Sequence, residues 1–471
     1  MSRGGSSKSF VMIVAGTRPE TVKVAPVIWE LDRLGVEYIF VWTGQHYDYE
    51  MGRLFFEQLR LPEPMIYLES GRVSHHVSES VAIMVKELTH LIEEYDPTIV
   101  YALGDTNTTL SAALASVYAG KPFVHDEAGM RSFDSAMLEE INRRIADTVA
   151  NFRLAPTNIA VLNLLCEGFP LSSIRLVGST AVDTLLYVLN RGLLKSDIVN
   201  ELSLEPQHYV LVTVHRRENL IDVRLTKIAS ILTNIAKALP EYKVVFPVHP
   251  HTKKRLSELG IISIPREYKN ILLLEPLGYL EFVALVKDAG LIITDSGGVQ
   301  EEAFVLGKKT LTLRKTTEWP ESVVLGYSYL VDVDRVEVSN VLKLVQALMQ
   351  LHREAPHDFS TFPLGDGRAG WRVARILKTL IETKAIKRGL EIPNPNPYPA
   401  PTLIEFTGDA LHHYITLCFE GKVPAVSFEE LSARDIRCVA RESGLSAEIF
   451  NKLIKVDWSK VDQSIERIFG V

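Results

Sequence analysis

The sequence predicts an α/β protein built from two successive doubly wound domains. Continuous apolar runs of strand length alternate with helix-length segments from residue 9 to about 365, as expected for parallel strands covered on both faces. Glycines and polar residues follow several of these runs, at the carboxyl ends of strands where open sheets place their ligands. The series starts again near residue 209, so we expect domains at residues 1–190 and 205–365.

Composition narrows the class of protein. The chain has 471 residues, of which 46% are hydrophobic and 23% charged, a globular composition. Its net charge of −7 argues against a nucleic-acid partner. The three cysteines are Cys166, Cys418 and Cys438, and their odd number and wide spacing predict a reducing cytoplasm and no metal cluster. No apolar run has the length of a membrane span, and residues 1–8 lack the apolar core of a signal peptide, so we expect no membrane association.

The first domain opens with an apolar strand at residues 10–14. The helix that follows has Thr17 or Arg18 as its N-cap and stops at Gly35. Arg18 and Lys23 cluster at its N-terminal end, where two cations beside a helix N-terminus suit a diphosphate. Either residue alone is as readily a solvated surface charge.

Three carboxylates come from three later loops of this domain. Asp105 follows the strand at 98–103 and also suits the cap of the next helix; Glu127 follows the strand at 121–125; Glu139 opens the helix at 138–146. We expect them to converge on one cleft. Acids packed together and partly desolvated raise the pKa of at least one of them, which suits general acid and base catalysis near neutral pH.

The helix at 138–146 also carries a periodic apolar pattern. Ile141, Ile145 and Val149 recur at intervals of four, which predicts that they are buried. Glu139 and Arg143 share another face, where a plain surface ion pair is the alternative to a role at the site.

In the second domain, the strand at 291–294 breaks at Asp295-Ser-Gly-Gly298 before a helix starts. Glycines let a ligand approach the backbone, and a helix N-terminus offers unpaired N–H donors, so the stretch predicts a phosphate site. Ser296 adds a hydroxyl, and Glu302, about one turn into the helix, is placed to accept both hydroxyls of a ribose. A tight capped turn is the alternative interpretation.

Other candidates in this domain lie at or near strand ends. His215, Arg216 and Arg217 follow the strand at 209–214 and suit an anionic substrate. Arg314 leaves the end of the strand at 310–314. Phe282 offers a ring that suits stacking on a base, with core packing as the alternative.

Eight segments between residues 9 and 382 resemble, in sequence and in order, segments of the UDP-N-acetylglucosamine 2-epimerase family, and they resemble archaeal members most. The resemblance implies a GT-B fold with two Rossmann-like domains facing a cleft, and usually a homodimer. It also implies interconversion of UDP-GlcNAc and UDP-ManNAc without metal or NAD. The matching segments are Gly16-Thr-Arg-Pro-Glu20, Thr43-Gly-Gln-His46, Gly104-Asp-Thr-Asn-Thr108, Glu127-Ala-Gly129, Glu139-Glu-Ile-Asn-Arg143, His215-Arg-Arg-Glu-Asn219, Asp295-Ser-Gly-Gly-Val-Gln-Glu-Glu302 and Arg314 with Thr316-Thr-Glu318.

The family mechanism removes the C2 proton, expels UDP from C1 to give a glycal, and adds UDP back with protonation from the opposite face. The resemblance implies that Asp105, Glu127 and Glu139 are the catalytic acids, with His215 assisting the diphosphate. It implies that Glu302 takes the ribose and Phe282 the uracil side. The residues implied to hold the phosphates and neighbouring groups are Arg18, Lys23, Arg143, Ser296, Gly297, Gly298 and Arg314.

Three positions depart from the family pattern: Asp126 stands where valine is common, Leu138 where proline is common, and Trp319 where arginine is common. Asp126 places an extra acid beside Glu127, which predicts a raised pKa of Glu127 or a changed substrate. Residues 71–73 lack the Gly-Gln segment that binds a regulatory UDP-GlcNAc in many bacterial members. Three alternatives stay open: a hydrolysing enzyme giving ManNAc and UDP, a 2-epimerase of a related UDP-sugar, and a degenerate nucleotide-sugar binding protein.

The C-terminal part lies outside the resemblance. We expect a helix at 366–384 that packs back on the first domain, a proline-rich linker at 385–401, and a mostly helical extension at 402–471. Short capped helices are predicted at 427–436 and 445–454, with a third near 458–469. A role in partner docking or in stabilising a dimer is expected for this extension.

Overall fold

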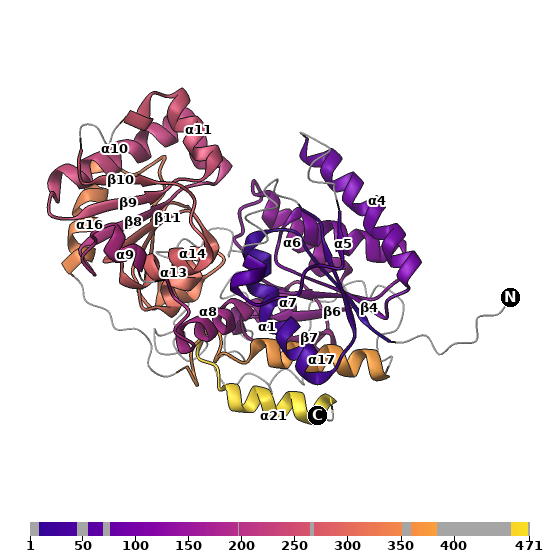
Figure 1. The fold of residues 1–471 in the computed structure, drawn as a ribbon. Helices are drawn as coiled ribbons and strands as arrows, with labels where there is room; N and C mark the ends of the chain where they lie inside the picture. The colour runs from indigo at the N-terminus through magenta and orange to yellow at the C-terminus, as the bar shows by residue number, and fades with distance from the viewer. Residues whose placement is uncertain are drawn as a thin grey trace, which may run out of the picture. The chain divides into compact units, whose positions relative to one another are not determined.

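The computed structural model describes residues 9–44, 55–68, 76–195, 197–263, 268–350, 359–383 and 454–469. The proline-rich segment and the first two helices predicted for the extension lie outside these residues. The chain divides into two compact units (Figure 1). Unit 1 takes in the described residues up to Tyr187 and those from residue 359 onward, and unit 2 begins at Val188 and contains the described residues to 350.

Unit 1 contains a seven-stranded parallel sheet in the order β3-β2-β1-β4-β5-β6-β7. Apolar strands alternate with helices, as the sequence predicts, because the strands of a parallel sheet are covered by helices on both faces. The strands are β1 (Val11–Ala15), β2 (Tyr38–Trp42), β3 (Ile66–Tyr67), β4 (Ile99–Leu103), β5 (Phe123–Asp126), β6 (Phe152–Ala155) and β7 (Ile174–Leu176).

The helices of unit 1 follow the strands in a doubly wound order. Helices α4 and α5 close one face of the sheet through Leu88, Ile92 and Ala112, while α1 packs against α17. The elements are α1 (Arg18–Leu34), α4 (Val77–Tyr95), α5 (Asn107–Tyr118), α6 (Leu138–Val149), α7 (Asn158–Cys166), the 3₁₀ turn η1 (Leu171–Ser173), α8 (Thr180–Asn190), α17 (Ala369–Thr383) and α21 (Trp458–Phe469).

The ends of α1 are those that the sequence predicts. Thr17 is the N-cap and forms a capping box with Glu20, in which each side chain accepts the other residue's backbone N–H. Gly35 ends the helix in a left-handed conformation with φ of 64°. These caps orient the N-terminus of α1, where Arg18 lies.

The predicted burial of Ile141, Ile145 and Val149 on α6 is wrong. Ile141 is 43% exposed, and the other two are partly exposed. The buried face of α6 instead carries Asn142 and Arg143, together with Asp147, because these polar side chains find partners on neighbouring elements, namely Asn107 on α5, Asp105 after β4 and His125 on β5. The periodicity identifies an apolar stripe along the helix, but a single sequence does not show which face of a helix meets the sheet.

Unit 2 contains a six-stranded parallel sheet in the order β10-β9-β8-β11-β12-β13. Its two halves have the same doubly wound arrangement as unit 1, so the chain has the two Rossmann-like α/β units of the predicted GT-B-like class. The strands are β8 (Tyr209–Thr213), β9 (Lys243–Pro247), β10 (Ile271–Leu274), β11 (Leu291–Thr294), β12 (Thr310–Thr312) and β13 (Ser328–Leu330).

Helices α10 and α16 pack together on one face of the unit 2 sheet, around Ile228, Ile235 and Val345. No helix in the described part of the chain has both the length and the apolar character needed to cross a bilayer. The helices are α9 (Asp197–Glu201), η2 (Arg217–Leu220), α10 (Asp222–Ala238), α11 (Pro250–Glu258), η3 (Ile261–Ser263), α13 (Tyr279–Asp288), α14 (Gly297–Val305), α15 (Pro320–Val324) and α16 (Val338–Gln350).

The last helix, α21, docks against α17 in unit 1 (Figure 1). Trp458 is 1% exposed, and its indole N–H donates to the carbonyl of Phe362 at 2.9 Å. Its ring lies 4.6 Å from the guanidinium of Arg372, a buried cation that also pairs with Asp462 at 2.6 Å and with Asp366 at 2.8 Å. The extension therefore contributes an aromatic ring and a counter-ion to the interior of unit 1.

Replacing Trp458 by alanine will destabilise unit 1, because it empties a large buried site and removes the cation–π partner of Arg372. We expect the free energy of unfolding to fall by about 3–5 kcal/mol, the cost typical of buried tryptophan. Thermal unfolding followed by circular dichroism measures the loss. Lys460→Ala is the control: the Lys460 side chain, on the same helix, is 79% exposed, so its loss should change stability by less than about 0.5 kcal/mol.

Candidate functional site

Each sheet has one point where the strand order reverses direction, and four of the predicted site residues follow the strands on either side of it. In unit 1 the reversal lies between β1 and β4, and in unit 2 between β8 and β11. Loops leave the carboxyl ends of these strands in opposite directions, which opens a crevice for ligands. Arg18 and Asp105 follow the two strands in unit 1; His215 and Ser296 follow the two strands in unit 2.

Glu127 leaves β5 in a left-handed conformation, with φ of 61°. A residue with a side chain adopts this conformation at a cost of about 1–2 kcal/mol, and such residues concentrate at functional sites. The backbone N–H of Glu127 donates to Oδ1 of Asp126 at 2.8 Å, and its Oε1 lies 2.6 Å from Nζ of Lys23. The cation stabilises negative charge on this nearly buried carboxylate. Lys23, which the sequence predicts beside a diphosphate, thus forms an ion pair with Glu127, a predicted catalytic acid.

Asp105 lies at the rim of the β4 loop, with its side chain 34% exposed. Arg143, which is buried, contacts Oδ2 of Asp105 through Nη2 and Oε2 of Glu140 through Nη1 at 2.9 Å. The N-cap of α5 is Thr106, whose hydroxyl accepts the N–H of Thr109, so the Asp105 side chain is not the helix cap. The structure therefore brings the predicted residues Asp105 and Arg143 together.

Glu139 and Arg18 complete the predicted set in unit 1. Glu139 is half-buried in the first turn of α6, directly before Glu140, which contacts Arg143. Arg18 is half-buried as the first residue of α1.

Asp126 is fully buried next to Glu127. Its Oδ2 accepts the hydroxyl of Tyr101 at 2.6 Å, while its Oδ1 holds the Glu127 N–H. Burial raises the pKa of Asp126 to about 6, against the opposing effect of these two hydrogen bonds. Burial, with the charge of Asp126, also raises the pKa of Tyr101 well above its ordinary value.

His125 and Asp147 form a second buried network beneath this loop. The two ring nitrogens of His125 face Oδ1 of Asp147 at 2.7 Å and the carbonyl of Gly104 at 2.8 Å. Burial acts to raise the pKa of Asp147, but the charges of Arg131 and His125 outweigh it and hold that pKa well below its usual range.

In unit 2 the N-terminus of α14 is capped by Ser296, whose hydroxyl accepts the N–H of Val299 at 3.4 Å. Asp295, fully buried, accepts the backbone N–H of His215 at 3.1 Å and that of Arg216 at 3.0 Å, as well as the side chain of Asn219 at 3.0 Å. One carboxylate therefore fixes the loop after β8 beside the start of α14. The His215 side chain remains 41% exposed.

The remaining candidates of unit 2 lie around the same helix or near it in sequence. Arg314 is buried and forms a double ion pair with Glu318, at 2.5 and 2.9 Å. Glu302 is half-buried on α14; together with burial, its charge raises the pKa of Tyr279 on α13. Phe282 is half-buried on α13, so its ring is not sealed in the core.

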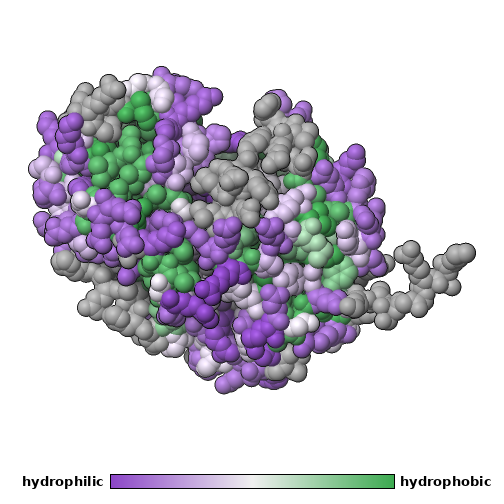
Figure 2. Space-filling view, viewed as in Figure 1, coloured by the Kyte–Doolittle hydropathy of each residue, from purple (hydrophilic) through white to green (hydrophobic). Residues whose placement is uncertain are grey.

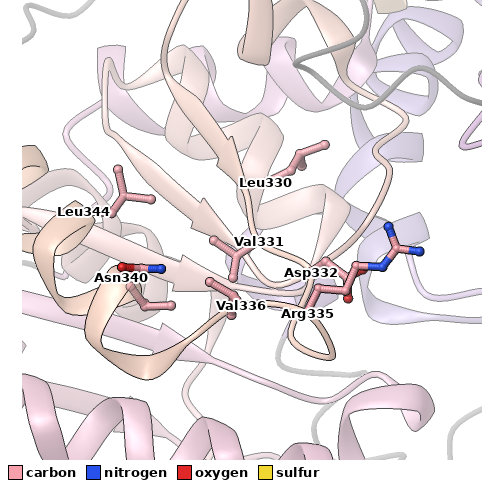
Figure 3. A pocket seen from close by; sticks show the side chains of 8 residues that line it. Leu330, Val331, Asp332, Arg335, Val336, Asn340 and Leu344 are labelled. Atoms are coloured by element: carbon pink, nitrogen blue, oxygen red, sulfur yellow. The ribbon is translucent and has the colours of Figure 1, made fainter.

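A pocket of about 300 Å³ in unit 2 lies away from these residues in the sequence, beside β13 and α16 (Figure 3). Leu330, Val331, Val336 and Leu344 give it an apolar lining, and Figure 3 shows the guanidinium of Arg335 directed away from them. It contains none of the predicted site residues. Among the described residues, no three His, Cys, Asp or Glu side chains are grouped so as to hold a metal ion.

The family profile described as UDP-N-acetylglucosamine 2-epimerase matches residues 30–378, about three quarters of the chain. The chain belongs to the UDP-N-acetylglucosamine 2-epimerase family. A relative of that name from Methanocaldococcus jannaschii is 37% identical over 375 residues, covering 78% of this chain and 98% of the relative. A UDP-2,3-diacetamido-2,3-dideoxy-D-glucuronate 2-epimerase from Pseudomonas aeruginosa is 35% identical, covering 79% and 99%.

Solved structures of the epimerase family share the fold. The M. jannaschii UDP-GlcNAc 2-epimerase in complex with UDP-GlcNAc and UDP has 36% sequence identity and a TM-score of 0.70, over 79% of this chain and 99% of that one. The Neisseria meningitidis enzyme bound to UDP-GlcNAc has 30% identity and a TM-score of 0.70, over 78% and 99%. The predicted family and its resemblance to archaeal members are thereby confirmed.

Two buried carboxylates of this epimerase-family chain escaped the assignment of roles from sequence. Asp295 holds the β8 loop, as described above. Glu20 accepts the N–H groups of Gly16 and Thr17, both at 2.8 Å, and the hydroxyl of Thr106 at 2.5 Å, so it joins the loop after β1 to the loop after β4. Burial raises the pKa of Glu20 in spite of these donors. The Thr-x-x-Glu spacing of a capping box was the signal available for Glu20.

Asp126 predicts a pH-dependent stability. Its pKa in the folded chain, about 6, lies above the ordinary value of 3.8, so its contribution is complete below about pH 4 and is lost as pH rises through 6. In Asp126→Asn this dependence disappears. The unfolding free energy of the wild type minus that of this variant should therefore fall by about 2–2.5 kcal/mol between pH 4 and pH 7.5, measured by urea unfolding. A difference that stays constant over this range would contradict the burial cost described here.

Proposed function

We propose that this protein interconverts UDP-GlcNAc and UDP-ManNAc by removing the C2 proton with elimination and re-addition of UDP. The observation that carries the proposal is the presence of Asp105, Glu127 and Glu139 in a chain that covers 98% of a relative named UDP-N-acetylglucosamine 2-epimerase. The anion-binding helix start of unit 2 supports it, because the leaving group of this reaction is a diphosphate.

The acids of unit 1 supply the proton transfers. The C2 proton is weakly acidic, so its base must be ionised and held at contact distance. Glu127 suits the second requirement, because Nζ of Lys23 lies 2.6 Å from its Oε1 and its backbone N–H donates to Asp126 at 2.8 Å. We assign Glu127 as one base, Glu139 as the acid for the opposite face, and Asp105, held by Arg143, as the third catalytic acid.

Unit 2 binds UDP in this proposal. The N–H groups at the start of α14, with Ser296, Gly297 and Gly298, receive the phosphates, and partial positive charge at the helix start stabilises the diphosphate as it departs. His215 and Arg314 assist the diphosphate, together with Arg18 of unit 1. Glu302 takes the ribose hydroxyls and Phe282 the uracil side. Because hydrogen leaves C2 as a proton and not as a hydride, the reaction does not call on NAD.

The function is tested by incubating the protein with UDP-GlcNAc in D2O and following proton NMR. Deuterium at C2 in a mixed pool of UDP-GlcNAc and UDP-ManNAc is expected. Glu127→Gln should slow this exchange by about 10²–10⁴-fold, the usual effect of losing a general base, and leave the Kd for UDP within about twofold.

Glu94→Gln, on the exposed side of α4, is the matched control and should exchange at the wild-type rate. Free ManNAc and UDP would instead place the protein among hydrolysing enzymes. UDP binding without any exchange would mean another UDP-sugar or a binding role.

We also propose that the protein is a homodimer through α5 and α6. Large apolar side chains are exposed there: Tyr118 by 71%, Leu138 by 48% and Ile141 by 43%. The two helices are neighbours in unit 1, and Figure 2 shows hydrophobic residues at the surface over them. Exposed apolar patches of this kind mark protein interfaces, and a two-fold axis is the commonest way for identical chains to bury one.

A cytoplasmic location fits Cys166, which forms no disulfide.

Ile141→Arg should convert the dimer into a monomer, because it places an unpaired cation in an apolar interface. Sedimentation velocity of the two proteins gives the mass directly. Val223→Arg, at a 78%-exposed position on α10 of unit 2, is the matched control and should remain dimeric. A wild-type monomer at micromolar concentration would refute this interface.

A further inference from the structure

Trp319 is a departure from the family pattern that is built into the interior of unit 2. It is 3% exposed and immediately precedes α15. Its backbone N–H donates to the hydroxyl of Thr317 at 3.0 Å, and its carbonyl accepts the hydroxyl of Ser322 at 2.8 Å. The main chain on both sides of the indole is therefore fixed.

The same two hydroxyl groups connect this loop to α14. Gln300, fully buried on α14, accepts the hydroxyl of Thr317 at 2.7 Å and donates to the hydroxyl of Ser322 at 2.9 Å. Since both ends of one amide are used, the position of Trp319 relative to α14 is set by directional bonds as well as by packing.

The indole N–H is the polar atom that this network leaves unused. Trp319 is 3% exposed as a whole, and in the described part of the chain no acceptor is found for its indole N–H. It is directed toward the first residue of α14: a Cβ built on Gly297 would lie 3.9 Å from Nε1 of Trp319, 3.9 Å from Nη1 of Arg314 and 3.5 Å from Oε2 of Glu318. These three groups border one small space above the helix start.

Gly297 is not needed there for the fold. Its φ is not positive, and an added Cβ would meet nothing closer than 3.5 Å. Glycine at a helix position usually costs about 0.5–1 kcal/mol relative to alanine. What glycine provides is open space beside unpaired N–H groups of a nine-residue helix.

The charges around this space favour an anion. Glu318 is neutralised by its double ion pair with Arg314, and Nη2 of Arg216 lies 3.9 Å from the same carboxylate. Two guanidinium groups thus surround one carboxylate. An N–H that faces this space and has no acceptor in the protein is available to a ligand oxygen, and hydrogen bonds to charged groups are the stronger ones.

We infer that the indole N–H of Trp319 donates a hydrogen bond to a phosphate oxygen of UDP bound at the start of α14. This inference rests on the proposed function and adds a specificity-determining residue to it. Where family members commonly carry an arginine, this chain uses a neutral and directional donor. Binding through Trp319 consequently requires a phosphate oxygen at one position, while the local positive charge is supplied by Arg314 and Arg216.

The test compares UDP and uridine binding to the wild type and to Trp319→Phe, which keeps an aromatic ring and removes the donor. We expect the Kd for UDP to rise about tenfold and that for uridine to stay within twofold, since hydrogen bonds to charged groups are worth at least this factor. Trp371→Phe, a half-buried tryptophan between Arg368 and Arg375 in unit 1, is the matched control and should bind UDP as the wild type does.

Indole NMR signals give a second readout in the wild type. The chain has five tryptophans, and Trp319 is the one whose indole signal should move downfield on addition of UDP and not of uridine. Trp319→Arg introduces the residue that is common in the family, and loss of one indole signal in this variant assigns that signal to Trp319. The variant should bind UDP within threefold of the wild type. It keeps the test available if Trp319→Phe fails to fold.

An unmoved Trp319 signal at saturating UDP would overturn the inference, as would equal UDP affinity in Trp319→Phe, and the proposed function would stand. A wild type that binds neither UDP nor UDP-GlcNAc would overturn both.

Discussion

In each unit, a buried carboxylate holds together the two loops at which the strand order reverses. Glu20 does so in unit 1 by accepting backbone N–H groups from the loop after β1 and the hydroxyl of Thr106 from the loop after β4. Asp295, which itself follows β11, does so in unit 2 by accepting two backbone N–H groups and the Asn219 side chain from the segment after β8. A buried carboxylate is costly unless several donors satisfy it, and here the donors belong to the segments that must be aligned. Arg18, Asp105, His215 and Ser296 lie on these loops, so their positions depend on two carboxylates that are not themselves among the candidate site residues.

The regular elements and the loops that carry the site were predictable from the sequence because they follow from local rules. The apolar runs are strands, Thr17 and Gly35 are caps, and Ser296 opens a helix, each decided by residues a few positions apart. The parallel direction of the strands follows from the βα alternation.

Contacts between distant segments were not predictable in this way. Lys23 was expected on a diphosphate and lies on Glu127, since the β5 loop passes over the first turns of α1 only in the folded sheet. The exposed position of Ile141 has a similar origin: Asn142, Arg143 and Asp147 look like surface residues in sequence, but partners on other elements make their face the buried one. Periodicity identifies faces, and only tertiary partners decide which one is covered.

The docking of α21 has a consequence for biosynthesis. Residues 188–350 of unit 2 form one nearly continuous stretch, whereas unit 1 needs segments from both ends of the chain, because Arg372 and Trp458 complete its interior. A nascent chain therefore exposes all of the described part of unit 2 before unit 1 has received α17 and α21. The N-terminal part of unit 1 therefore stays incompletely folded while unit 2 is synthesised. During translation it depends on protection from aggregation, because its interior lacks α17 and α21.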